Sequence, residues 1–276
     1  LMIGWKAAQA MAYSLDRPLI GVNHLQAHLY SPWFVGDPPE SRWEKFEPNI
    51  SLIVSGGHTL IVKVAAPLDH EVLGTTQDDA AGECFDKTAK LLGLGYPGGP
   101  AVERTAKTGD AARYKLPRPL LDRAGLDMSF AGLKTAAARI IEQDGFTSAD
   151  APDLCASYQK AIADCLSARS DRALEGFAGG PDAKRLVVAG GVAANTAIRN
   201  ALEAVAAKHG ARLVAPPLRH CTDNAAMIAL AGAERLAADE VPAEAMMFSA
   251  RPRWPLDEQS ALTSPAYGGG KRGAKA

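Results

Sequence analysis

Aromatic residues are scarce in this sequence. They make up 6% of its 276 residues, whereas hydrophobic residues of all kinds make up 47%. The core must therefore be built mainly from alanine, valine, leucine and isoleucine. Long apolar runs are also missing, because no stretch reaches the roughly 18 residues that a membrane-spanning helix needs. The N-terminus has no charged region before an apolar one, which is unlike a secretory signal peptide. We expect a cytoplasmic protein without membrane contact.

Closely spaced cysteine pairs and an excess of charge are absent too. The sequence has four cysteines, none in a Cys-x-x-Cys pair, which argues against a disulfide framework and favours reduced thiols. The formal net charge is -1, so the chain is not a wholly basic nucleic-acid binder, although a local basic face is compatible with it. One candidate face lies in a proline-rich stretch, and another in the C-terminal tail. Their basic residues are Arg113, Lys115, Arg118 and Arg123, and Lys271, Arg272 and Lys275.

Strand and helix patterns alternate along the chain, which predicts an α/β fold. We expect helices over 2–15, 79–92, 132–141, 151–174, 194–207 and 223–236, and one more that carries His24 and His28. We expect strands at 19–22, 50–54, 59–64, 185–189 and 212–214. The segment 96–100 has the composition of a turn, and 113–127 that of an irregular stretch.

His24 and His28 are four residues apart, a spacing that places both imidazoles on one face of a helix within reach of one metal. In a chain with six histidines such a pair also arises by chance, so two helix histidines without a metal remain an alternative. A metalloprotease site is disfavoured, because its general base is a glutamate directly after the first histidine, and Leu25 stands there.

Asp223 opens a later helix, where Thr222 or Asp223 can serve as the N-cap. Its carboxylate can instead complete a site of two histidines and one carboxylate, an arrangement suited to iron or to catalytic zinc. Asp86 is a mid-helix acid beside an apolar residue, and such a carboxylate facing a cleft can bind hydroxyl groups or a cation.

Two Gly-Gly turns follow expected strands, Ser55-Gly56-Gly57 and Gly190-Gly191. Glycine lets the backbone approach a phosphate and point N–H groups at it, and a helix start after the turn adds its dipole. The two turns suggest two lobes that face one nucleotide. A plain β-hairpin and an ordinary strand-to-helix turn are the alternatives.

The order of the motifs is more specific than any one of them. The sequence contains, in this order, NHLQAHL, VSGGHTLIV, DDAAGECFDKTAKLLGLGYPGGP, SFAGLKT, AGGVAANTAIR, CTDNAAMIA and SARPRWPL. Over about residues 1–256 it resembles the TsaD family, and the block at 79–100 is the most specific part. The resemblance implies an actin-like ATPase fold with two lobes. It also implies transfer of threonylcarbamoyl from threonylcarbamoyl-adenylate to the N6 amine of the adenosine next to the anticodon, in tRNAs that read ANN codons.

Carried over by position, the resemblance implies one divalent metal, usually iron with zinc as the alternative, held by His24, His28 and Asp223. It implies substrate-binding positions at Ile53, Val54, Ser55, Gly56, Gly57, Asp86, Gly99 and Asn195. It implies tRNA as substrate and TsaB-like and TsaE-like proteins as partners. No general base is assigned.

The sequence departs from the family pattern in two places. Ala131 replaces the second serine of the SFSGLKT motif, which removes its hydroxyl. The family's N-terminal strand, with its GIETSCDET-like loop, has no counterpart, so we expect an incomplete N-terminal lobe. The expected division is a remnant of that lobe at 1–45 with the histidine helix, a second lobe at 46–256 with a helical insertion around 100–175, and a flexible basic tail at 257–276. The alternative function is a non-catalytic nucleotide-binding partner, or a truncated inactive form of the same family.

Overall fold

A five-stranded mixed sheet forms the centre of the fold. The computed structural model describes residues 1–36, 40–42, 46–177, 185–238, 249–252 and 254–257. The strands lie in the order β5 (Asp69–Thr75), β4 (Thr59–Ala66), β3 (Asn49–Val54), β6 (Arg185–Ala189) and β7 (Arg212–Val214). The pairs β3–β4 and β4–β5 are antiparallel, whereas β3–β6 and β6–β7 are parallel. The short strands β1 (Phe34–Val35) and β2 (Glu40–Ser41) pair separately.

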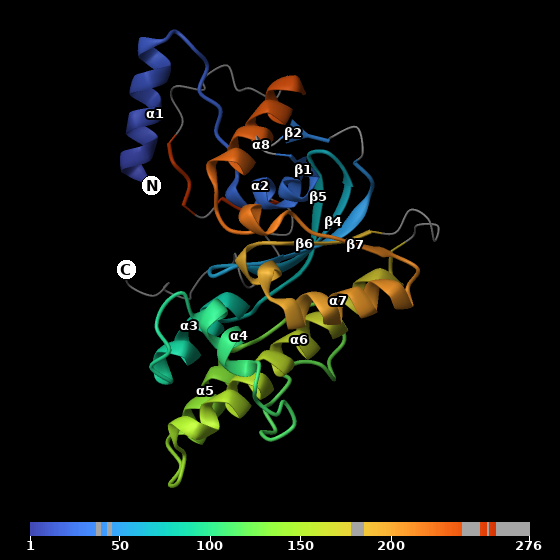
Figure 1. Ribbon diagram of the computed structural model, residues 1–276. Helices are drawn as coiled ribbons and strands as arrows, with labels where there is room; N and C mark the ends of the chain where they lie inside the picture. The colour runs from blue at the N-terminus through green and yellow to red at the C-terminus, as the bar shows by residue number, and fades with distance from the viewer. Residues whose placement is uncertain (37–39, 43–45, 178–184, 239–248, 253, 258–276) are drawn as a thin grey trace.

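Helices cover both faces of this sheet (Figure 1). On one side lie α2 (His24–Tyr30) and α8 (Ala225–Ala237), with α1 (Met2–Ser14) at the margin of the molecule. On the other side lie α3 (Ala81–Leu91), α4 (Gly98–Ala106), α5 (Ala131–Ile141), α6 (Ala151–Glu175) and α7 (Thr196–Lys208). The predicted α/β class is therefore confirmed.

Strand β3 explains why the sheet needs cover on both faces. All of its residues are buried, as is typical of a central strand. Ile50, Leu52 and Val54 belong to the core formed with the α3–α7 side, whereas Ile53 belongs to the core formed with α2 and α8. This alternation follows from the two-residue period of side chains along a strand. The end of β3 is therefore fixed from both sides.

Most predicted elements are present, with three exceptions. The predicted strand at 19–22 is wrong: this segment has no regular secondary structure, because no strand of the described chain pairs with it. Strand β5 was not expected, because its first half is polar and partly exposed. Residues 98–100 are the first turn of α4 and not a turn between elements, and a proline in a first helical turn loses no hydrogen bond.

The stretch at 113–127 is irregular as predicted, and two of its basic residues form ion pairs. Arg113 forms ion pairs of 2.6 Å with Asp150 and 2.7 Å with Asp153. Arg118 forms an ion pair of 2.7 Å with Asp164. Carboxylates at the start of α6 and within it therefore oppose the charges of Arg113 and Arg118. Lys115 and Arg123 are exposed, and a basic surface on this stretch stays a prediction.

Other expectations concern parts of the chain that the structure leaves undescribed. Lys271, Arg272 and Lys275, the basic residues of the expected tail, lie outside the described residues. The division into lobes at 1–45 and 46–256 stays a prediction. Among the described helices, none combines the length and the apolar character that crossing a membrane requires.

Candidate functional site

Helix α2 holds the histidine pair in a fixed geometry. Asn23 is its N-cap, and the Asn23 side-chain oxygen accepts a hydrogen bond of 2.9 Å from the Leu25 N–H. His24 and His28 then lie one turn apart, with ring centroids 4.7 Å apart at 81°. The His28 side chain is 0% exposed and that of His24 is 42% exposed, so the pair runs from the interior to the surface.

Asp223 meets both imidazoles. Its Oδ1 lies 3.1 Å from Nε2 of His28 and 3.5 Å from Nε2 of His24. The expected capping role is wrong, because Asn224 caps α8 by accepting a hydrogen bond of 2.9 Å from the Met227 N–H. The Asp223 carboxylate is thus not needed for the helix and faces the histidines with 73% of its side chain exposed.

These three side chains fit a divalent metal. Their candidate ligand atoms all lie within 4.8 Å of one another. Metal–nitrogen and metal–oxygen bonds of about 2.0–2.2 Å place tetrahedral ligand atoms roughly 3.4 Å apart, close to the distances from Asp223 Oδ1 to the two imidazoles. Burial, and after it the neighbouring His24, lower the pKa of His28 to about 4. The Asp223 carboxylate acts in the opposite direction and raises this pKa, but its effect is smaller. A neutral imidazole is the form that binds metals, and in the described chain the buried Nδ1 of His28 has no hydrogen-bond partner.

The turn after β3 lies beside the histidines. Ser55 N–H donates to the His58 carbonyl at 2.8 Å, and the Ser55 Oγ accepts from the His58 N–H at 3.1 Å. These bonds close the β3–β4 hairpin and leave Gly56 and Gly57 exposed. Ile53 and Val54 have buried side chains, so only their main chain can contact a ligand.

His58 is a residue that sequence reasoning did not single out. Its ring centroid lies 6.4 Å from that of His24, the more exposed histidine of the candidate metal site. Burial and the nearby His24 lower its pKa. The only signal in the sequence was its position next to the Gly-Gly turn.

The second Gly-Gly turn follows β6, the parallel neighbour of β3. Gly190 has a φ of +96°, and a Cβ added there would lie 2.4 Å from the Val54 carbonyl oxygen. Only glycine is therefore suited to this position. The expectation that the two turns come from different lobes is wrong, because both lie at the carboxyl ends of adjacent strands in one sheet. This is the edge at which α/β sheets bind ligands.

Helix α3 packs closely against the first turn. Its N-terminal residues are tied to the hairpin by bonds from Ala81 N–H to Thr59 Oγ1 at 2.9 Å and from Gly82 N–H to the Ser55 carbonyl at 3.2 Å. One turn further along, the Asp86 Oδ1 accepts a hydrogen bond of 2.8 Å from the Gly98 N–H at the start of α4. The Asp86 carboxylate therefore links α3 to the helix that carries Gly99.

Asn195, the last of the predicted substrate-binding residues, is the N-cap of α7. Its Oδ1 accepts from the Ile198 N–H at 3.0 Å, and its Nδ2 donates to the Gln159 Oε1 at 2.7 Å. Next to it, the Thr196 N–H donates to Glu103 Oε1 at 2.8 Å, which brings the acidic side chain of α4 to the start of α7. Glu103 is a second residue that sequence reasoning missed, since a lone acid on a helix carries no signal.

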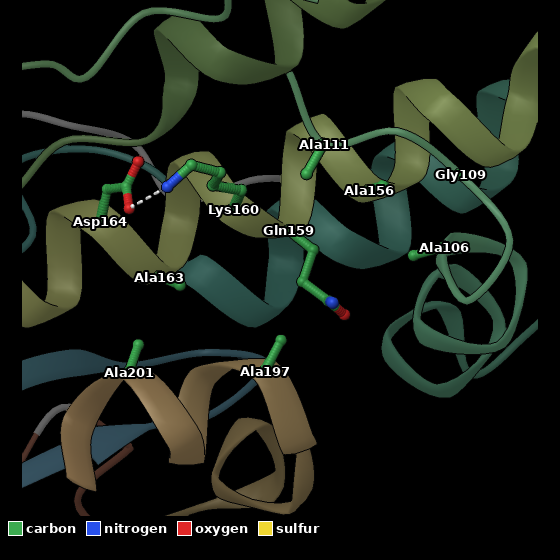
Figure 2. Close-up of a pocket in the computed structure, with 10 residues that line it drawn as sticks. All are labelled: Ala106, Gly109, Ala111, Ala156, Gln159, Lys160, Ala163, Asp164, Ala197 and Ala201. Atoms are coloured by element: carbon green, nitrogen blue, oxygen red, sulfur yellow. Dashed lines mark hydrogen bonds and ion pairs between the residues drawn. The ribbon is translucent and has the colours of Figure 1, made fainter. Parts of the chain in front are cut away.

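A hollow of about 340 Å³ lies behind Asn195, between α6 and α7. In Figure 2 the Gln159 side chain projects from α6 into this space, above Ala197 and Ala201 of α7, and Lys160 pairs with Asp164. Alanines form most of the lining, and none of the predicted site residues takes part in it. The hollow therefore adjoins the predicted site and does not coincide with it.

The sequence matches the TsaD family, described as tRNA N6-adenosine threonylcarbamoyltransferase, over residues 1–230. The tRNA N6-adenosine threonylcarbamoyltransferase of Brucella ovis is 52% identical over 280 residues, which cover 100% of this chain and 75% of that protein. The protein of the same name from Brucella anthropi is 51% identical over the same shares.

Solved structures of HypF share the fold. The chain superimposes on T. kodakarensis HypF with a TM-score of 0.61 and 18% identity, covering 88% of this chain and 40% of that one. Full-length HypF in its phosphate- and nucleotide-bound form gives a TM-score of 0.56 and 16% identity, covering 85% and 38%. The chain thus spans less than half of the HypF chains, and the likeness shows the fold alone. By its sequence, the chain belongs to the TsaD family of tRNA N6-adenosine threonylcarbamoyltransferases.

Proposed function

We propose that this protein transfers the threonylcarbamoyl group from threonylcarbamoyl-adenylate to the N6 amine of the adenosine next to the anticodon of tRNA. In this reaction the bond from the carbamoyl carbon to the phosphate oxygen breaks, a bond to N6 forms, and AMP and a proton leave. The observation that carries the proposal is the gathering of the family motifs at one sheet edge. The His24–His28–Asp223 group and both Gly-Gly turns lie there together.

The residues on one side of this edge suit the phosphate of the adenylate, and those on the other side suit its ribose and base. Main-chain N–H groups of the exposed turn at Gly56 and Gly57 can approach a phosphate. We expect Asp86, Gly99 and Asn195 to line the adjoining α3–α4–α7 side, where a carboxylate and an amide can bind ribose hydroxyls or the base. Because the adenosine amine is a weak nucleophile, holding it close to the carbamoyl carbon supplies much of the rate.

We further propose that His24, His28 and Asp223 hold one divalent metal, iron in preference to zinc. Such an ion can polarise phosphate and carbamoyl oxygens when it is bound. TsaB-like and TsaE-like proteins are the proposed partners, and the cytoplasm is the proposed location, because the family modifies tRNA.

The activity is tested by incubating the protein with synthetic threonylcarbamoyl-adenylate and an unmodified tRNA, with and without TsaB-like and TsaE-like proteins. Digestion and mass spectrometry should detect N6-threonylcarbamoyladenosine. A tRNA with guanosine at the target position is the control and should stay unmodified. Absence of the product in every mixture, with adenylate still bound, would overturn the transferase and favour the non-catalytic alternative.

The metal is tested by elemental analysis of protein purified without chelators. The wild type should contain about one metal per chain, and His28→Ala should contain far less, because it removes the buried ligand. Equal metal contents in both proteins would refute the assignment. His209→Ala is a suitable control, because that histidine pairs with Asp171 at 2.6 Å and not with the metal group.

A further inference from the structure

The C-terminal SARPRWPL motif has no role in the site described so far. We call residues 249–252 and 254–257, the described part of this region, the C-terminal strap. The Asn23 side-chain NH2 donates one hydrogen bond to the Trp254 carbonyl and one to the Pro255 carbonyl, both at 3.0 Å. The oxygen of the same amide caps α2 at the Leu25 N–H. One buried amide therefore joins the strap to the helix that begins with His24.

The Trp254 side chain connects the strap to α8 as well. The guanidinium carbons of Arg235 and Arg251 lie 5.7 Å and 5.3 Å from the centre of its ring, within the range of cation–π attraction. Arg235 belongs to α8, and its Nη1 donates a hydrogen bond of 2.9 Å to the Gly21 carbonyl just before α2. Arg235 thus connects the Trp254 ring of the strap both to α8 and to the segment that precedes α2.

The end of the strap is anchored in the core and on the sheet. Leu256 packs against the cluster that contains Leu25 of α2 and Met227 of α8. The Asp257 Oδ2 accepts a hydrogen bond of 3.3 Å from the Val72 N–H of β5. The strap therefore contacts the helix that carries both histidines, the helix that directly follows Asp223, and the sheet beneath them.

We propose that this strap is a positioning element for the metal site. It fixes α2 against α8, and so sets the distance between the two imidazoles and the Asp223 carboxylate. Helix α2 has only seven residues, too few to be stable alone, so its placement depends on such contacts. The inference rests on the metal site proposed above. Asn23 and Trp254 act through the ligands as positioning residues.

Two substitutions at Asn23 separate the strap from the helix cap. Asn23→Ser keeps an oxygen that caps α2 but cannot reach the strap carbonyls, whereas Asn23→Ala removes both functions. Affinity for zinc and cobalt is measured by competition with a chromophoric chelator, and the visible spectrum of the cobalt form reports ligand geometry. Both variants should bind about tenfold more weakly than wild type, with shifted cobalt bands, as is usual when groups behind the ligands are changed.

Trp254 gives a second, independent pair of variants. Trp254→Leu should weaken metal binding in the same way, and Trp254→Phe should restore most of it by keeping an aromatic face between the two arginines. Thr147→Ala is the control, because it removes the capping side chain before α6, far along the chain, and should cost stability without changing metal affinity. Thermal unfolding in the presence of EDTA checks that each variant is folded.

Three outcomes would overturn the inference. Wild-type affinity in both Asn23→Ser and Trp254→Leu would show that the strap does not act on the site, and would leave the metal site standing. A loss of affinity in Thr147→Ala as large as in these variants would indicate general instability. Equal metal affinity in wild type and His28→Ala would overturn the metal site together with the strap's role.

Discussion

The close packing of α3 on the first Gly-Gly turn allows a sharp test of the site. A Cβ added at Gly82 would lie 2.4 Å from the Ser55 carbonyl oxygen and 2.8 Å from the Gly56 Cα. Both are backbone atoms and cannot rotate away. Gly82→Ala must therefore push α3 and the turn apart, and it weakens the bond from the Gly82 N–H to the Ser55 carbonyl. Overpacking of this kind typically destabilises a protein by about 1–3 kcal/mol.

Gly56, in the turn that Gly82 packs against, is the matched control because it has room for a side chain. A Cβ built there meets nothing within 4 Å, and its φ is not in the left-handed region. Gly56→Ala should change the free energy of unfolding by less than about 0.5 kcal/mol, as most exposed substitutions do. If the turn binds the adenylate phosphate, however, the added methyl group lies where the ligand must approach. The affinity should then fall although the fold is unchanged.

Thermal unfolding and calorimetric titration with a non-hydrolysable adenylate analogue decide between these effects. For a chain of this size, 1 kcal/mol corresponds to a shift of roughly 2–4 °C in Tm. Gly82→Ala should lower Tm by several degrees, whereas Gly56→Ala should keep the wild-type Tm and bind the analogue more weakly. An unchanged Tm in Gly82→Ala would refute the packing argument. Unchanged affinity in Gly56→Ala would refute the assignment of the turn to the ligand.

Three further predictions follow from other parts of the structure. Burial lowers the pKa of His70 from 6.5 to about 4, so the unfolded chain takes up the proton first as the pH falls. The stability that depends on neutral His70 is full above pH 6.5 and is lost toward pH 4, and at pH 5 the loss is roughly 2 kcal/mol. Urea unfolding in EDTA should show that the free energy of unfolding falls less between pH 7 and pH 5 in His70→Gln than in wild type. An equal fall in both proteins would contradict this account. Neutralising Arg113, Lys115 and Arg118 together should change the log–log salt slope of tRNA binding by less than about one, because α6 carboxylates already oppose two of these charges. A change of about three would instead identify this stretch as a tRNA contact. Asp86→Asn keeps an oxygen for the main-chain N–H at the start of α4, so Tm should be retained while analogue affinity falls, and wild-type affinity would argue against a ligand role.

Much of the fold was predictable because periodicity is a local property. The strand at 185–189 and the long helix α6 have clear apolar patterns, and the structure places them almost as expected. The strand at 19–22 failed because a four-residue apolar run looks the same whether it pairs in a sheet or packs as extended chain. β5 and α4 were missed because a polar edge strand and a glycine-rich helix start lack the usual local signals.

The metal group was predictable for a different reason. The spacing of His24 and His28 is local, but the approach of Asp223 is a long-range contact, which residue chemistry offered as one alternative and the resemblance to a family favoured. The partners of polar groups were not predictable at all. Asp78, for example, directly precedes the helix expected at 79–92, yet its Oδ1 accepts from the Phe130 N–H at 2.7 Å and from the Ala131 N–H at 3.1 Å at the start of α5. Such contacts depend on tertiary packing, which single-sequence patterns do not encode.

Residues that the fold does not need are the most informative about function. Asn224, and not Asp223, caps α8, and the salt bridges of Asp223 in the described chain are those to His24 and His28. An exposed carboxylate placed against a buried imidazole whose pKa is lowered to about 4 gains little from that contact alone. Gly56 likewise has room for a side chain and an ordinary φ, so packing does not require a glycine there. Stability therefore explains Gly82 and Gly190 but not Asp223 and Gly56. A cation between the ligands and a phosphate at the turn would explain both.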